Sequence, residues 1–470
     1  MSPSRTTQNT TPRTRPSAGF ALSLLVRQRD GIVRTIIDRA ADLGGEVFSI
    51  EPESVDTRRI VIAASSAAHH DELQTALADL EGIELLEAHD ATFALHEGGK
   101  LAIAARAEIR GPEDLAMAYT PGVGRVSTAI AENTDRVWTY TGRRNAVAVL
   151  SNGTAVLGLG DIGPEAAMPV MEGKAVLFKN FGGVDAYPVC VNGRTVEEMV
   201  AIGMAIAPTF GGINLEDIKA PECFEIEQRL QAALDIPVFH DDQHGTAIVA
   251  LAALENAAKV VGKPLGELRV VIVGTGAAGV ACAQLIHHVG VADVIGVDST
   301  GILHQGREGL TPTKQWFVEH GNRDGRTGGV REALVGADVL FGLSGPGNIE
   351  PDWLAAMASD AIVFAMANPV PEIMPEQMPA NVRVVATGRS DYPNQINNVL
   401  AFPGVFRGLL DVRATRCTIE MKLAAAAALA SMVPEPTSTR IIPGAFEDGV
   451  TQAVADAVSM TAIEQGYVRN

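Results

Sequence analysis

The sequence predicts an α/β protein with a doubly wound domain of the Rossmann type, a second α/β domain before it, and a ferredoxin-like α+β domain at the start. Three observations predict this class. Residues 18–98 follow the order β-α-β-β-α-β. Residues 99–245 alternate short apolar strands with helices. In residues 246–400, a glycine-rich turn joins a β-branched run to a helical run.

Length and composition limit the possible classes of protein. A chain of 470 residues is too long for one hydrophobic core and predicts several domains. The net charge of −19 argues against a nucleic-acid surface, and no apolar run reaches the ~18 residues that span a membrane. The four cysteines are far apart and form no CxxC pair, so we expect a reducing cytoplasm and neither zinc nor disulfides.

The first residues predict a tail and then a small domain. Residues 1–17 are polar, basic and rich in Pro and Thr, with no apolar run behind the charges, so we expect a disordered tail and not a signal peptide. The next block predicts strands and amphipathic helices in turn: strand 20–27, helix 29–45, strands 46–54 and 58–65, helix 70–82 and strand 83–96.

This order, with the Asp30-Gly31 turn before its first helix, resembles an ACT domain, a small module that binds effectors in metabolic enzymes. The resemblance implies a small-molecule effector, with Asp30 and Gly31 as candidate contacts. The alternative is a packing or dimerisation domain that binds no ligand.

Carboxylates follow two predicted strands of the second block, residues 99–245. Glu216 and Asp217 follow the strand at 209–214, and Asp241 and Asp242 follow the strand at 236–240. The ends of neighbouring strands can meet in one cleft, so Glu216, Asp217 and Asp242 are candidate ligands of one hard cation, Mg²⁺ or Mn²⁺. Asp241 is then free to pair with a catalytic lysine. We expect His240 and His244 to orient neighbours or to pack, not to bind the metal.

The remaining elements of this block are two strands, 146–152 and 155–163, and a helix that starts at Pro164 and closes with Gly182-Gly183.

A dinucleotide fingerprint marks the third block, residues 246–400. Strand 270–273 leads into G-x-G-x-x-G, formed by Gly274, Thr275, Gly276, Ala277, Ala278 and Gly279. The glycines permit the tight turn, the approach of a pyrophosphate and close helix packing. Asp298 ends the next strand, where it can bind the ribose hydroxyls. Ser299 and Thr300 follow it, which favours NAD over NADP, although Arg307 could reverse that preference. Further strands are expected within 337–349 and 360–373, and residues 401–470 predict helices that pack on the second block.

A divalent metal beside a nicotinamide suggests a reaction that needs both hydride transfer and an electron sink for a carbanion. Oxidative decarboxylation of a hydroxy acid is the simplest such reaction.

With these features in place, residues 99–470 closely resemble the malic enzymes in their short bacterial form. The resemblance is carried by AYTPGV (118–123), NGTAVLGLGDIGP (152–164), MEGKA (171–175), NLEDI (214–218), FHDDQHGTA (239–247), GTGAAG (274–279), ANP (367–369) and NQINNVLAFPG (394–404). It implies L-malate as substrate, NAD or NADP, a divalent metal, and a homodimer or larger homo-oligomer. Ala155 stands where larger members carry a substrate-binding arginine, so the substrate carboxylate must be bound by another group.

The resemblance also implies residue roles. Lys174 would be the base that takes the C2 hydroxyl proton, and Tyr119 the acid that protonates the enolate carbon. Asn368 and Asn398 would contact cofactor or substrate near the nicotinamide. A lysine base needs a pKa lowered towards roughly 7–8, and burial beside a cation acts in that direction. Lys179 is the competing lysine, expected to be a solvated charge.

Two alternatives to malate oxidation remain open at this point. A malolactic enzyme would share the motifs but release lactate without net reduction of NAD. An inactive metabolite-sensing protein would use only the ACT-like block.

Overall fold

The computed structural model describes residues 16–27, 31–291 and 293–469, and the chain divides into two compact units, Met1–Ala102 and Ile103–Asn470. No helix in these ranges is long and apolar enough to cross a membrane. The expected tail lies outside the described residues except for Pro16 and Ser17, and Asp30 also lies outside them.

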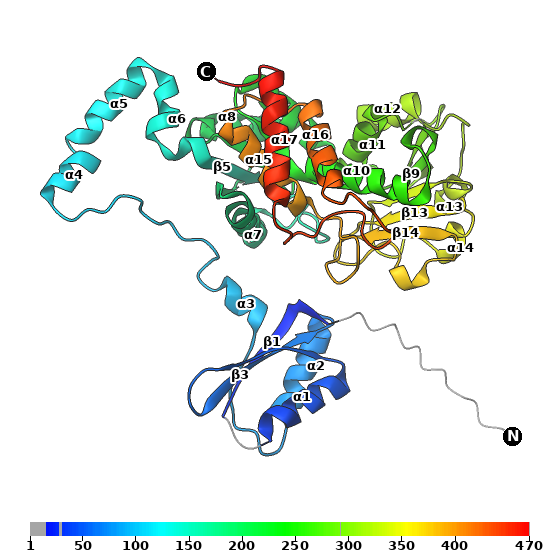
Figure 1. Ribbon diagram of the computed structural model, residues 1–470, viewed down its shortest axis with the longest axis horizontal. Coiled ribbons are helices and arrows are strands. Elements are labelled where there is room, and N and C mark those ends of the chain that lie inside the picture. Colours follow the sequence, from blue (N-terminus) through cyan, green and yellow to red (C-terminus); the bar gives the residue numbers. More distant parts are fainter. Residues whose placement is uncertain (1–15, 28–30, 292, 470) are drawn as a thin grey trace. The chain divides into compact units, whose positions relative to one another are not determined.

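The first unit contains one antiparallel sheet of four strands with two helices on one face (Figure 1). Its elements are β1 (Ser17–Arg27), α1 (Ile32–Leu43), β2 (Glu46–Pro52), β3 (Thr57–Ala64), α2 (Ala67–Ala78) and β4 (Leu85–Asp90). The strand order β2-β3-β1-β4 is the connectivity of a ferredoxin-like unit. The core lies between sheet and helices, where Leu22 and Leu24 meet Ile36 and Leu73.

The last strand of this unit is shorter than the prediction of 83–96. It ends at Asp90, whose carboxylate accepts hydrogen bonds from the backbone N–H groups of Thr92 and Phe93 and so caps α3 (Ala91–His96). The N-cap interaction starts a helix where the apolar pattern alone suggested that the strand continues.

The second unit holds two parallel sheets. The first has the order β6-β5-β7-β8 and consists of β5 (Ala146–Ser151), β6 (Asp185–Cys190), β7 (Gly212–Leu215) and β8 (Val238–His240). Alternate residues of β5 face opposite sides: Ala148 and Leu150 pack toward α8 (Val196–Ile206) and α9 (Glu222–Ala233), whereas Val147 and Val149 pack toward α7 (Pro164–Gly182).

The predicted strand at 155–163 is wrong. This segment is a loop with a single bridge between Val156 and Gly160. Gly153, Gly160 and Gly163 have positive φ angles, and a Cβ on Gly153 would lie 2.2 Å from the Gly163 carbonyl oxygen. The glycines turn the chain back on itself, so an extended strand cannot form.

The second sheet is the dinucleotide-type sheet. Its order is β11-β10-β9-β12-β13-β14, and only β11 runs antiparallel to its neighbour. The strands are β9 (Arg269–Val273), β10 (Asp293–Asp298), β11 (Gly301–Ile302), β12 (Val339–Gly342), β13 (Ala361–Ala365) and β14 (Val382–Thr387). Helices lie on both faces, as the doubly wound prediction requires: α10 (Asp241–Val261) and α11 (Ala277–His288) on one, α13 (Val330–Leu334) and α14 (Pro351–Leu354) on the other. The helix α12 (Pro312–His320) follows β11 along the chain.

The C-terminal helices join the two sheets. These are α15 (Phe402–Asp411), α16 (Ile419–Ser431) and α17 (Val450–Glu464). Phe402 in α15 packs on Phe178 in α7 with ring centroids 4.6 Å apart, and α16 packs along α10. One continuous core therefore runs from the first sheet to the second.

One segment of the second unit contributes no buried residue to its core. The helices α4 (Pro112–Ala118) and α5 (Gly122–Glu132), followed by α6 (Val137–Tyr140), lead into the first sheet (Figure 1). No residue from 101 to 136 is buried. We call residues 103–136 the arm.

Candidate active site

The candidate site forms where two parallel strands end. Glu216 and Asp217 directly follow β7, and Asp241 and Asp242 follow β8 and open α10. The two strands are neighbours, so both pairs of carboxylates meet at the same edge of the sheet, as the sequence predicted. Glu216, Asp217 and Asp242 each offer a carboxylate oxygen, and these oxygens lie within 4.8 Å of one another.

Lys174 reaches this cluster from α7. Its ammonium nitrogen lies 2.5 Å from Asp241 Oδ2 and 2.8 Å from Glu216 Oε1, and it sits over the Phe402 ring at 4.2 Å. Asp241 therefore pairs with the lysine. The competitor Lys179 is exposed and pairs with Asp185 at 2.7 Å.

The charge state of Lys174 differs from the prediction. Burial lowers the pKa of its ammonium group, but the charges of Asp241, Glu216 and Asp242 outweigh burial, so the pKa lies above its ordinary value. Burial and a nearby cation would lower the pKa of Lys174, as predicted, but the three facing carboxylates reverse that effect. Among the protein's own groups, Lys174 is thus held as an ammonium ion.

The charged forms of the three carboxylates are unfavourable in this site. Burial, reinforced by repulsion from neighbouring carboxylates, raises the pKa of Glu216, Asp217 and Asp242. Asp217 Oδ2 is buried and has no hydrogen-bond partner among the described residues. A divalent cation would relieve both conditions, and an all-oxygen donor set suits Mg²⁺ or Mn²⁺.

Other residues that hold this cluster were not found from the sequence. Asn214 donates a hydrogen bond of 2.8 Å to Glu216 Oε2, and the Asp217 backbone N–H donates one of 2.8 Å to Asp242 Oδ2. A Cβ on Gly245 would lie 1.9 Å from Asp241 Oδ1, so only glycine leaves room for that carboxylate. Asn214 lies within the NLEDI motif, but no pattern of residue types marks its role.

Behind the site, His244 contacts a buried carboxylate, Glu227. Its Nε2 lies 2.9 Å from Glu227 Oε2, and Glu227 also accepts a hydrogen bond of 3.0 Å from the His240 backbone N–H. Glu227 comes from α9 and is buried, so it fixes the start of α10. Neither histidine belongs to the cluster of carboxylates that could hold a metal.

Tyr119 is not near these residues. It is the C-cap of α4 in the arm, and its side chain is 68% exposed. Its backbone donates to Leu115 and accepts from Val123 within the arm. The structure of one chain does not bring Tyr119 to Lys174.

The glycine-rich turn has the geometry of a phosphate site. Gly274 has φ +104°, and a Cβ there would lie 2.2 Å from the Leu343 carbonyl oxygen, whereas a Cβ on Gly279 would lie 2.0 Å from the Gly274 carbonyl oxygen. A Cβ on Gly276 would meet open space. Gly276 is the N-cap of α11 and supplies no side-chain cap, so a phosphate could accept hydrogen bonds from the first backbone N–H groups of this helix. The Thr275 hydroxyl beside them is buried and unpartnered among the described residues.

Asp298 ends β10, as predicted, but it does not stand alone. Both of its oxygens accept hydrogen bonds from Arg307, at 2.6 and 2.7 Å, and Lys314 in α12 lies 2.7 Å from Oδ2. These contacts hold the pKa of Asp298 well below its ordinary value despite burial. Lys314 was missed because it lies on a separate helix.

The two asparagines expected near the nicotinamide, Asn368 and Asn398, have different surroundings. Asn398 donates a hydrogen bond to Asp241 Oδ2, so it touches the partner of Lys174. Asn368 is exposed beyond the carboxyl end of β13. A Cβ on Gly158 would lie 3.4 Å from its carbonyl oxygen, so the loop 155–163 runs beside it.

Two protein-family models match this chain. The family model described as "Malic enzyme, NAD binding domain" matches residues 243–463, and the one described as "Malic enzyme, N-terminal domain" matches residues 100–198 and 192–231.

Individual relatives agree with this. The chain is 49% identical to an NAD-dependent malic enzyme of Geobacillus stearothermophilus over 461 residues, which is 96% of each chain. It is 51% identical to a bifunctional malic/malolactic enzyme of Bacillus subtilis (strain 168) over 375 residues, 79% of this chain and 92% of that one. The crystal structure of a malic enzyme from Pyrococcus horikoshii Ot3 matches with a TM-score of 0.76 and 49% identity, over 79% of this chain and 88% of that one. The chain therefore belongs to the malic enzyme family, the decarboxylating malate dehydrogenases.

Proposed function

We propose that the protein converts L-malate to pyruvate and CO₂ with reduction of NAD, at a site built from Lys174 and the carboxylates around it. One observation carries this proposal. Lys174 is buried between Asp241 and Glu216, directly beside the cluster of Glu216, Asp217 and Asp242. A base, a place for a divalent cation and a dinucleotide turn in one compact unit are the parts that oxidative decarboxylation of a hydroxy acid needs.

The three carboxylates would hold Mg²⁺ or Mn²⁺. When bound, the metal supplies Lewis-acid polarisation of the oxygen on C2 and of the adjacent carboxylate. A divalent cation in the carboxylate cluster would offset the charges that keep Lys174 protonated, so its pKa would fall and it could lose its proton. The neutral amine of Lys174 then accepts the proton of the C2 hydroxyl as C2 is oxidised and the hydride leaves. Asp241 and Asn398 keep the lysine side chain in place during this transfer. Tyr119 later gives a proton to the carbon that loses CO₂.

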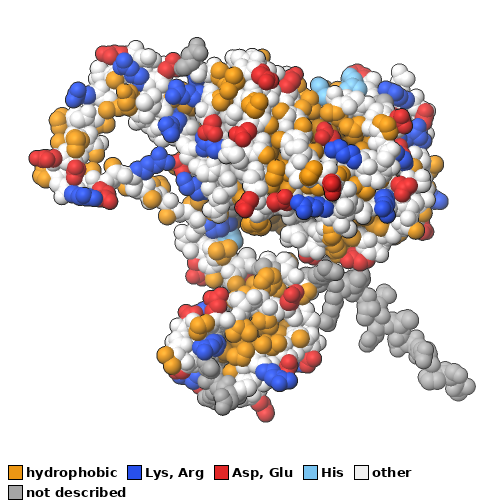
Figure 2. All heavy atoms as spheres, viewed as in Figure 1, with side chains coloured by type: hydrophobic (Ala, Val, Ile, Leu, Met, Phe, Trp, Pro, Cys, Tyr) orange, Lys and Arg blue, Asp and Glu red, His pale blue; other side chains and the backbone are white. Residues whose placement is uncertain are grey.

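We infer that Tyr119 acts in the site of a second copy of the chain. The arm exposes Ile103, Leu115, Met117 and Tyr119, and no residue between 101 and 136 is buried, so the described part of the chain leaves these four apolar side chains largely uncovered. Figure 2 shows hydrophobic side chains on the surface of this segment. Covering that surface with a second copy favours association. This arrangement would place a tyrosine from each chain near the lysine of the other, in a homodimer or larger homo-oligomer.

A mixing experiment tests this arrangement. Tyr119→Phe and Lys174→Ala should each inactivate the homodimer. After both are unfolded together and refolded, the mixture should regain roughly a quarter of wild-type activity, because half of the dimers are mixed and each mixed dimer has one intact site of two. The double variant Tyr119→Phe/Lys174→Ala, refolded with wild type, serves as the control and should leave no intact site in mixed dimers. Activity that stays at the level of the separate variants would place Tyr119 in the site of its own chain.

For the cofactor, we propose that NAD is preferred and NADP is accepted. A carboxylate at the end of β10 favours the ribose diol and repels a 2′-phosphate. Asp298, however, faces two cations, Arg307 and Lys314, so the local charge is positive. With this excess of positive charge, the site would also accept the 2′-phosphate of NADP.

Replacement of Asp298 should therefore reverse the preference. In Asp298→Ser, Arg307 and Lys314 lose their carboxylate and become free to bind a 2′-phosphate. We expect the ratio of kcat/KM for NADP to that for NAD to rise by about tenfold or more, which corresponds to about 1.4 kcal/mol. Asp352→Ser, an exposed carboxylate of α14, controls for loss of charge. An unchanged ratio would mean that this cluster does not face the ribose.

We propose that the first unit is an ACT-like module that binds a small effector. Its support is the β-α-β-β-α-β order and the left-handed Gly31 that caps α1.

The four free cysteines support a cytoplasmic location.

A malolactic reaction is the second candidate, because the Bacillus subtilis relative is named a bifunctional malic/malolactic enzyme. The two reactions differ in their products. With L-malate, Mn²⁺ and NAD, malate oxidation gives pyruvate and an equal amount of reduced NAD. Malolactic turnover gives lactate and no net reduction. Quantifying pyruvate and lactate after complete consumption of malate separates them, and lactate as the main product would overturn the proposal.

A further inference from the structure

A second charged site lies away from the active site. A cavity of about 440 Å³ is lined by Arg106, Arg144, Asn145, Arg407, Leu410, Asp411 and Arg413. Four arginines and one aspartate thus line the cavity, although the chain as a whole has 56 acidic and 37 basic residues. Such an excess of positive charge is unexpected in this chain unless an anion neutralises it.

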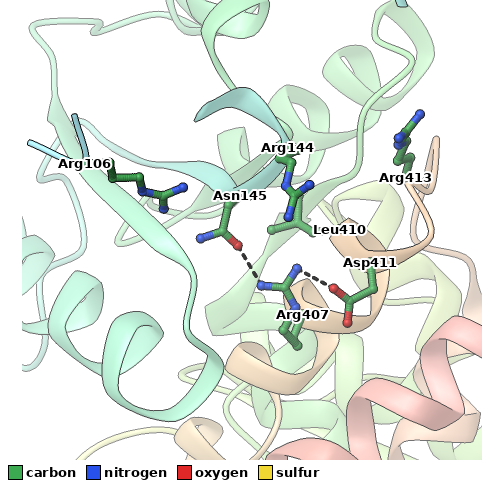
Figure 3. A pocket seen from close by; sticks show the side chains of 7 residues that line it. All are labelled: Arg106, Arg144, Asn145, Arg407, Leu410, Asp411 and Arg413. Carbon is green, nitrogen blue, oxygen red and sulfur yellow. Dashed lines mark hydrogen bonds and ion pairs between the residues drawn. The ribbon is translucent and has the colours of Figure 1, made fainter. Parts of the chain in front are cut away.

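One arginine of this cavity is held in a fixed orientation. Arg407 Nη1 donates a hydrogen bond of 2.7 Å to Asn145 Oδ1, and its Nη2 lies 2.6 Å from Asp411 Oδ1 (Figure 3). Its Nε is buried and has no partner among the described residues. A guanidinium fixed in this way needs little further ordering when it binds a ligand.

The other arginines are available. Within the described ranges, Arg144 and Arg413 form no ion pair, and Arg106 pairs only with Asp185, at 3.0 Å, while 79% of its side chain is exposed. Figure 3 shows the guanidinium groups of Arg106, Arg144 and Arg407 directed toward the space between them, with Arg413 at its margin. They come from three separate segments: the arm, the turn before β5, and α15 with the turn after it. A ligand with more than one oxyanion group could contact guanidinium groups from several of these segments.

The cavity is distinct from the catalytic site. Arg144 and Asn145 precede the amino end of β5, whereas the carboxylate cluster follows the carboxyl ends of its neighbours. The six residues of β5 span roughly 20 Å at about 3.3 Å each. One structural link is α15: Asn398, just before it, touches Asp241, and Arg407 lies near its other end.

We propose that this cavity binds a small ligand that carries two or more oxyanion groups, either phosphates or carboxylates. Guanidinium groups bind both kinds of oxyanion in bidentate geometry, so the arginines alone do not choose between them. The probes in the experiment make that choice. The site is independent of the malate reaction and of the effector proposed for the first unit.

Calorimetric titration of the full chain tests the proposal. Pyrophosphate and citrate are the probes, inorganic phosphate and acetate the comparators, with saturating NAD to occupy the dinucleotide turn and no divalent metal. We expect pyrophosphate or citrate to bind at least about tenfold more tightly than its comparator. Binding by pyrophosphate alone identifies a phosphate ligand, and binding by citrate alone identifies a polycarboxylate.

Variants locate the site. Arg144→Ser/Arg413→Ser should weaken that binding by about tenfold or more and leave malate turnover without the probe unchanged, which also shows that the variant folds. The single variant Arg413→Ser should have a smaller effect in the same direction. Arg331→Ser, an exposed arginine of α13, should have none. Absence of binding to the wild-type chain, or binding that the double variant retains in full, would overturn the proposal.

Discussion

Replacement of Lys174 by alanine should lower kcat for malate oxidation by roughly 10³-fold, because general-base catalysis contributes about 10²–10⁴-fold. The oxidation step and the decarboxylation step should both be lost, since the lysine lies against Asp241 and Glu216 at the centre of the site. Stopped-flow measurement of reduced nicotinamide and a separate assay of oxaloacetate decarboxylation report the two steps.

Two further variants make this result interpretable. Lys174→Ala leaves Asp241 and Glu216 buried without their cation, which destabilises the fold. Lys174→Arg keeps the charge but cannot give up its proton, so it should fold and remain inactive. Lys179→Ala, on the same helix α7 but exposed, should keep full activity. Substantial turnover by Lys174→Arg would show that the base is another group.

The second large effect should come from Asp217→Asn. Asparagine has nearly the same shape and tolerates the left-handed backbone at this position, where φ is +52°. It removes one negative charge and replaces an anionic carboxylate ligand with a neutral, weaker amide. Loss of a supporting group outside the ligands already costs metal affinity about 10–100-fold, so loss of a charged ligand should cost roughly 100-fold or more. Turnover at fixed Mn²⁺ should fall accordingly and recover in part at high Mn²⁺.

Thermal unfolding provides a readout that does not depend on activity. Mn²⁺ should raise the melting temperature of the wild-type chain, because it binds the folded state and offsets the burial and repulsion that raise the pKa of Asp217. The same Mn²⁺ concentration should have little effect on Asp217→Asn. Asp448→Asn, an exposed carboxylate outside the cluster, should behave like wild type. Equal stabilisation of all three proteins would mean that the metal binds elsewhere.

Much of the site could be predicted because its signals are local. The turn between β9 and α11 depends on glycines a few residues apart, and each carboxylate pair directly follows a strand. Parallel pairing of β7 and β8 then brings Glu216 and Asp242 together without further information.

The features that were missed depend on residues far apart in the chain. Lys314 reaches Asp298 from another helix, and Glu227 reaches His244 from another helix. The pKa of Lys174 follows from carboxylates that come from two strand ends. The apolar residues of the loop at 155–163 predict a strand because they mask the turns that its glycines make.

Tyr119 illustrates a different limit. Its motif predicts a role in catalysis, but a motif does not say which copy of a chain receives the residue. Only the exposure of the arm raises that question.

The most direct test of the proposed function is the initial rate of nicotinamide reduction with L-malate and Mn²⁺, measured in parallel with NAD and NADP. We expect reduction of both cofactors, faster with NAD, with one pyruvate formed for each reduced nicotinamide. Consumption of malate without net reduction, or no consumption with either cofactor by the intact Lys174 site, would contradict it.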